Sequence, residues 1–127
     1  MRWRKQQRVQ SSVRTTRRLL RDLRRIGRLE RDPVGLALRD ALGAATVRDA
    51  LLDVIERALQ HEVTMCRAIV ERCDVRGDST AEAAAELGLS LRSLFRYRRR
   101  ANEAIATAIA RALSSGARHE SGSFEAR

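Results

Sequence analysis

The stretch Ser79–Ala101 has the sequence STAEAAAELGLSLRSLFRYRRRA, which determines much of the fold expected for this chain. Its first residue and Glu82 form a capping box, in which each side chain bonds a backbone N–H that the first turn of a helix leaves without an acceptor. Gly88 suits the left-handed conformation that ends many helices. Ser90 is a typical cap for a following helix. The pattern predicts two helices joined by a short turn.

The turn between these helices spans about three residues, which is the spacing of a helix-turn-helix. We therefore expect a helix over 80–87 and a helix-turn-helix over 79–100. Ala84 lies four residues before Gly88 and is small enough for the two helices to cross closely. The expected apolar interior consists of Ala81, Ala84, Leu87, Leu89, Leu94 and Tyr97.

The second helix is expected to turn a basic face to solvent, because Ser90–Arg100 contains five arginines and no acidic residue. An α-helix fits the major groove of DNA, where its N-terminal residues meet base edges. Arg92 and Arg96 are four residues apart and point the same way, so we expect them to read bases. The full set of expected DNA contacts is Thr80, Ser90, Leu91, Arg92, Ser93, Phe95, Arg96, Arg98, Arg99 and Arg100.

These expected contacts fall into different roles. Thr80, Ser90 and the three arginines at 98–100 are better placed for phosphates, which hold register without reading sequence. Ser93 suits either a base or a phosphate. Phe95 has two interpretations, packing on a neighbouring helix or contact with a thymine methyl group.

The run from Arg67 to Ile105 resembles the DNA-binding domain of sigma-factor region four and its relatives among bacterial response regulators. The matching segments are ERCDVRGD, STAEAAAELGLS and LRSLFRYRRRANEAI, which together cover about a third of the chain. The resemblance implies that a lead-in helix packs across the helix pair and that the second helix enters the major groove. It places Ser90, Leu91, Arg92, Ser93, Phe95, Arg96 and Arg99 toward DNA. Neither a sigma region two nor a receiver domain is present, so a complete sigma factor is not expected.

Composition predicts an all-α fold, a small helical domain with additional helices before the helix-turn-helix. Alanine, leucine and arginine dominate the chain, and these residues lose little on entering a helix. Residues 32–113 are expected to form this domain, followed by a flexible tail over the Ser/Gly-rich residues 114–127.

The net charge of +10 is unevenly distributed. Residues 1–31 hold twelve bases and two acids, residues 32–79 six bases and nine acids, and residues 80–111 six bases and three acids. Two basic blocks separated by an acidic one indicate a polyanionic partner, and double-stranded DNA is the partner that we expect.

The first basic block is expected to comprise an arm over residues 1–12 and an arginine-rich helix over Val13–Leu29. Leu19, Leu20, Leu23 and Ile26 form a narrow apolar stripe along this helix. The segment fits a second contact on DNA phosphates, an arginine-rich RNA-binding helix, or a helix that docks on residues 32–59; we favour docking combined with phosphate contact. The candidate phosphate contacts are Arg14, Arg17, Arg18, Arg21, Arg24 and Arg25.

Residues that typically start or end helices predict the helices between the two basic blocks. Asp32 before a proline is a helix start, Gly43 a helix end, and Thr46 with an acidic residue three positions later another start. The second of these helices either continues beyond His61 or breaks near it. The segment Asp74–Asp78 is expected to be a turn.

No catalytic, metal or cofactor site is expected. Cys66 and Cys73 are seven residues apart, too far for a mutual disulfide within one helix, and His61 does not share a face with Cys66. Neither a signal peptide nor a membrane span is expected, which favours a cytoplasmic location. Besides a transcription regulator, the sequence leaves open an adaptor that binds RNA polymerase or another transcription protein, and a homodimer.

Overall fold

The computed structural model describes the backbone of residues 13–125 and the side chains as far as residue 116; the expected arm over 1–12 lies outside it. Helices and their connections account for this part of the chain, which contains no strand. The all-α prediction is therefore confirmed. The helices are residues 13–22, α2 (Ile26–Leu29), α3 (Pro33–Leu42), α4 (Val47–Leu59), α5 (Thr64–Val70), the π-helical turn η1 (Glu71–Val75), α6 (Thr80–Leu87) and α7 (Leu91–Glu125).

Helix boundaries follow the capping residues of the sequence. Asp32, Thr46 and Ser79 each accept a hydrogen bond from a backbone N–H in the first turn of α3, α4 and α6, respectively. Gly43 and Gly88 end α3 and α6 with φ of 64° and 67°, a conformation that strains other residues. These local predictions are confirmed.

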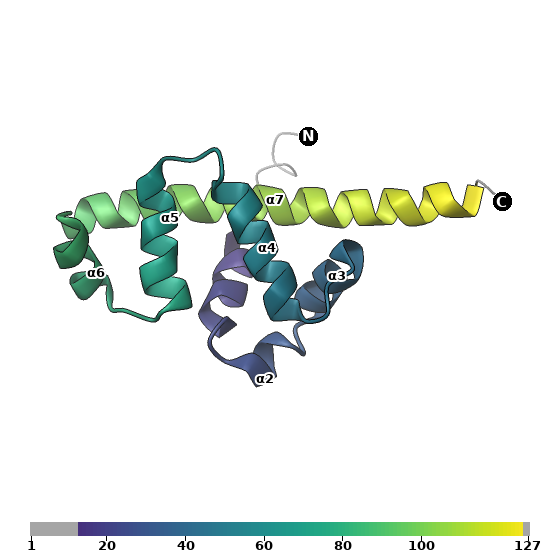
Figure 1. The fold of residues 1–127 in the computed structure, drawn as a ribbon, viewed down its shortest axis with the longest axis horizontal. Coiled ribbons are helices and arrows are strands. Elements are labelled where there is room, and N and C mark those ends of the chain that lie inside the picture. The colour runs from purple at the N-terminus through teal and green to yellow at the C-terminus, as the bar shows by residue number, and fades with distance from the viewer. Residues whose placement is uncertain (1–12, 126–127) are drawn as a thin grey trace.

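The long helix α7 organises the other elements (Figure 1). It contacts α3, α4, α5 and α6, and its C-terminal part extends past them. The main core lies between α7, α3, α4 and the N-terminal helix, and includes Leu19, Leu23, Leu38, Leu51 and Ile105, all fully buried. Because the other helices pack along α7, the first turns of α7 and their arginines lie at one end of the molecule.

A smaller core holds the elements around the turn before α7. Its buried members are Ile69, Cys73, Ala83, Ala84 and Leu94, and Tyr97 packs against both cores. The expected interior needs one correction: Ala81 is exposed, and Ala83 takes its place. The shift follows from the helical phase, since Ala83 and Ala84 share the side of α6 that packs toward η1 and α7.

The helix expected over Val13–Leu29 is interrupted. It ends at residue 22, and α2 begins at Ile26, whose side chain is 61% exposed rather than part of an apolar stripe. Leu23 and Leu29 are both fully buried, and the turn between them lets the chain bring both into the core. The many arginines of the segment also weaken a continuous helix, because they repel one another along it.

Three further segments bear on predictions made from the sequence: the region near His61, the turn at 74–78 and the residues after 114. The break near His61 is present, since α4 ends at Leu59 and α5 starts at Thr64. The first two residues of the expected turn at 74–78 belong to η1, so the turn proper begins later. The expected tail from residue 114 is helical as far as Glu125. Gly116 explains the start of this extension: a Cβ there would lie 2.6 Å from that of Ala41, so only glycine permits such close packing on α3.

Candidate nucleic-acid interface

The connection between α6 and α7 is tightly held. The Ser79 hydroxyl accepts a hydrogen bond from the Glu82 N–H at 3.1 Å, and the Leu89 N–H donates to the Ala84 carbonyl at 2.9 Å. The Ser90 hydroxyl accepts from the Ser93 N–H at 3.1 Å and so caps α7. The start of α7 is therefore fixed relative to α6.

The first turns of α7 present a mixed basic and apolar face. Leu91 and Phe95 are 48% and 51% exposed, large fractions for such side chains. Arg92 and Arg96 are exposed beside them, and neither forms an ion pair with any residue in the described part of the chain. Arg96 also lies over the ring of Tyr97, 5.6 Å from its centroid. Two guanidinium groups one helical turn apart are thus free to meet an external acceptor.

The next three arginines differ from these two, because each has an acidic partner. Arg98 donates to Asp74 at 2.8 Å, and Arg100 to Glu62 at 2.7 Å. Arg99 lies 3.6 Å from Glu103 on the following turn and keeps a 77% exposed side chain. The sequence grouped all three as phosphate contacts; the structure engages Arg98 and Arg100 internally and leaves Arg99 largely open.

The remaining predicted contacts lie at the helix starts. Thr80 is partly buried in the first turn of α6. Ser90 is exposed, and Ser93 is partly buried, with their hydroxyls 3.1 Å apart. Both serines therefore take part in the cap of α7.

Asp74 is a charged group that the sequence did not single out. It is 5% exposed, and its Oδ1 accepts the hydrogen bond from Arg98, while its Oδ2 is buried without a hydrogen-bond partner among the described residues. Burial raises the pKa of Asp74, and the nearby charges of Arg98 and Arg24 only partly oppose this. The π-helical turn η1, a conformation frequent at functional sites, carries this carboxylate.

A cleft of about 580 Å³ lies beside Asp74, between the N-terminal segment and α7. Arg17, Arg21 and Arg24 line it from one side. Phe95, Arg98 and Arg99 line it from the other. In Figure 1 the N-terminal helix, drawn in purple, runs next to α7. The two basic blocks of the sequence, separated by an acidic one, thus meet in space.

Arg24 lines this cleft and also lies against Gly77, in the loop before α6. The chain at Gly77 has φ of 85°, and a Cβ there would collide with the Arg24 guanidinium. The positive φ favours glycine at this point, because a side chain strains that backbone conformation, and the Arg24 guanidinium occupies the space above it. The Arg24 guanidinium therefore lies directly against the backbone of the loop before α6.

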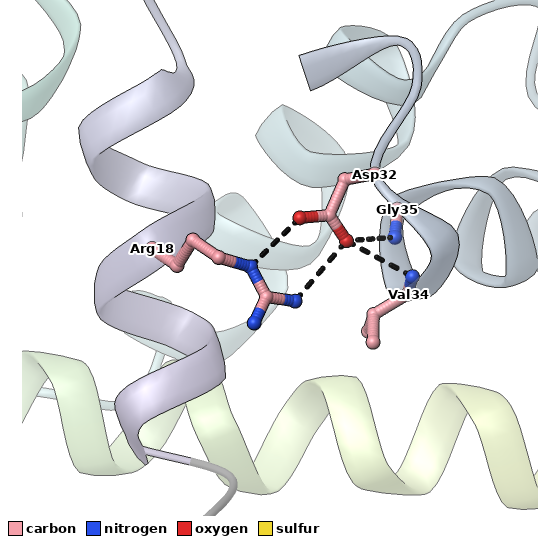
Figure 2. Close-up of polar contacts among 4 residues, drawn as sticks. All are labelled: Arg18, Asp32, Val34 and Gly35. Atoms are coloured by element: carbon pink, nitrogen blue, oxygen red, sulfur yellow. Dashed lines mark hydrogen bonds and ion pairs between the residues drawn. The ribbon is translucent and has the colours of Figure 1, made fainter. Parts of the chain in front are cut away.

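Arg18 has a different neighbourhood from its neighbours in sequence (Figure 2). The Arg18 Nε donates to Asp32 Oδ2 at 2.8 Å, and the Arg18 Nη2 donates to Asp32 Oδ1 at 3.2 Å. Asp32 Oδ1 also accepts from the N–H groups of Val34 and Gly35. Arg18 thus fastens the N-terminal helix to the cap of α3. Arg14 and Arg25, two other predicted phosphate contacts, are exposed and lie outside the lining of the cleft.

The cysteines are buried core residues. Both Cys66 and Cys73 are free thiols, and burial raises the pKa of each. The described residues contain no group of three or more histidine, cysteine, aspartate or glutamate side chains that could hold a metal ion.

No family model matches the chain, and neither a curated protein nor a solved structure is significantly similar to it. Within residues 13–125, no helix combines the length and the apolar character needed to cross a membrane. The resemblance to sigma-factor region four therefore remains a prediction from the sequence.

Proposed function

We propose that the chain is a sequence-specific DNA-binding regulator of transcription, in which α6 and α7 act as a helix-turn-helix. The observation that supports this proposal most strongly is a contrast within one helix. Arg92 and Arg96 are exposed without acidic partners among the described residues, while Arg98 and Arg100 are ion-paired. An unpaired arginine can make a bidentate contact to guanine in the major groove. We further propose that the protein is cytoplasmic and that its partner is duplex DNA.

The side chains around these arginines suit the same partner. Leu91 and Phe95 offer apolar contact to thymine methyl groups, the one apolar feature of the major-groove edge. The N–H groups of Leu91 and Arg92, which precede the one capped by Ser90, lie at the start of α7, where a helix favours a phosphate oxygen. Thr80, at the start of α6, faces phosphate in this docking.

Selection from a random duplex pool tests the proposal. We expect the wild-type protein to enrich a defined motif and Arg92→Ala/Arg96→Ala to lose it, because each bidentate contact contributes about 1–3 kcal/mol of discrimination. Arg57→Ala/Arg111→Ala is the matched control, since it removes the same charge from exposed positions on α4 and the far half of α7. Selection of the same motif by the Arg92/Arg96 variant would show that α7 does not read bases.

A protein-interaction adaptor is the second candidate, favoured by the half-exposed Leu91 and Phe95. Large apolar side chains grouped on a surface are typical of protein contacts. An adaptor predicts that wild-type protein binds no duplex even at low salt, so fluorescence anisotropy with a labelled random duplex separates the two functions.

A further inference from the structure

The cleft between the N-terminal segment and α7 carries an excess of positive charge. Arg17, Arg21 and Arg24 form no ion pair with the described residues, although Arg18 beside them is paired with Asp32. Among the described residues, five guanidinium groups line the cleft, and the single carboxylate that lines it, that of Asp74, is already bonded to Arg98. Like charges at this density repel each other, so an anion in the cleft would be stabilised by all of them.

The cleft is continuous with the face of α7 proposed to read bases. Phe95 belongs to both, since it is exposed on α7 beside Arg92 and Arg96 and also lines the cleft, and Arg99 extends the cleft along the same helix. Arg17 and Arg21 are four residues apart in one helix, which places them about 6 Å apart along its axis. Arginines spaced in this way match a linear series of phosphates better than a single compact anion.

We infer that the cleft binds the sugar-phosphate backbone of one DNA strand. The strand belongs to the same duplex whose major groove receives the first turns of α7. This inference rests on the proposed function and extends it, because it adds a backbone contact from the N-terminal helix. A strand that borders the major groove runs alongside a helix inserted into that groove, and the cleft lies alongside α7 at Phe95 and Arg99.

The inference divides the six predicted phosphate contacts of the N-terminal segment. Arg17, Arg21 and Arg24 touch the strand. Arg18 remains in its pair with Asp32, and Arg14 and Arg25 stay outside the cleft. The same division applies on α7, where Arg99 meets the strand while Arg98 holds Asp74 in place.

The salt dependence of binding tests this division. For a duplex carrying the selected motif, affinity is measured by fluorescence anisotropy over a series of KCl concentrations. We expect Arg17→Gln/Arg21→Gln to reduce the slope of log K against log salt by about 1.8, because each phosphate contact contributes about 0.9. The motif itself should not change. Arg14→Gln/Arg28→Gln, which removes two exposed arginines outside the cleft, is the matched control and should alter the slope by less than about half as much.

Thermal unfolding of both variants confirms that they fold, and the double variant spares Arg24 and its packing on Gly77. Equal slopes for the two variants would overturn the inference while the selected motif still supported the proposed function. Binding of inorganic tripolyphosphate that the cleft variant loses, with no change in the duplex slope, would assign the cleft to a free polyphosphate and also overturn it. No duplex binding by wild type would overturn inference and function together.

Discussion

Asp32 and Asp74 form the same kind of pair in two regions of the molecule, with opposite results. They are 8% and 5% exposed, and each accepts a hydrogen bond from an arginine at 2.8 Å. Burial acts to raise both pKa values. At Asp32 the hydrogen bonds from Arg18, Gly35 and Val34 outweigh burial and lower the pKa, whereas at Asp74 burial prevails and the pKa is raised.

Two things differ between the carboxylates: Asp74 lies deeper in the protein, so burial opposes its charged form more strongly, and fewer hydrogen-bond donors reach it. Asp32 receives two backbone N–H groups from the first turn of α3 in addition to both bonds from Arg18. Asp74 receives one bond from Arg98, and its second oxygen has no partner among the described residues. A buried ion pair stabilises a fold only when its remaining hydrogen-bonding capacity is also satisfied. Asp32 therefore fastens the fold, and Asp74 holds an arginine at the edge of a charged cleft at a cost in stability.

Asp32→Ala should have the largest effect on the free energy of unfolding. It removes the cap of α3 and leaves Arg18 without its partner, so we expect a loss of about 3 kcal/mol in urea unfolding. Asp40→Ala is the control, because Asp40 is exposed and, among the described residues, its side chain pairs only with its neighbour Arg39. Similar losses for both variants would show that the Arg18–Asp32 pair is no stronger than a surface contact.

The pH dependence of unfolding should separate the two aspartates, with a smaller effect. Because the pKa of Asp32 is lowered in the folded state, its contribution is present above the ordinary aspartate value of about 3.9 and is lost as the pH falls below it. Because the pKa of Asp74 is raised, its contribution is present below that value and is lost as the pH rises above it. The stability difference between wild type and Asp32→Asn should therefore shrink in acid, while Asp74→Asn should gain on wild type toward neutral pH. Parallel curves for the two variants would contradict this contrast.

Asp74→Asn should have the smallest effect on stability, within about 1 kcal/mol of wild type at neutral pH, because it removes a poorly satisfied buried charge. It should instead strengthen duplex binding and steepen the salt slope by up to about 0.9, since Arg98 becomes available to the cleft. Asp53→Asn removes an exposed charge on α4 and serves as the control. A loss of duplex affinity in Asp74→Asn would mean that Asp74 positions Arg98 for binding rather than withholding it.

Much of the fold could be predicted because its signals are local. Ser79, Thr46 and Asp32 cap helices through bonds that reach only two or three residues, and Gly88 ends α6 through its own backbone conformation. The exposure of Arg92 and Arg96 follows from helical periodicity in the same way.

The cleft could not be predicted, because it depends on contacts between residues far apart in sequence. Arg18 and Asp32 are 14 residues apart, and Arg98 and Asp74 are 24 apart, so no periodicity connects them. The same limit explains the interrupted helix at 23–25, where the burial of Leu23 and Leu29 in the tertiary core outweighs local pattern. Charge counting located two basic blocks, but only packing brought them together.

The continuity of α7 links the orientation of its exposed arginines to the packing of the core. Arg92 and Arg96 stand on the same uninterrupted helix as Ala101, Ile105 and Ile109, which are buried against the rest of the fold. Each residue of an α-helix rotates the next by about 100°. The angle at which the arginines leave the molecule is therefore a matter of rotational phase. A single residue inserted between Arg100 and Ala101 would turn that face by more than a quarter of a circle with every side chain retained, whereas seven inserted residues would nearly restore its direction about 10 Å further out.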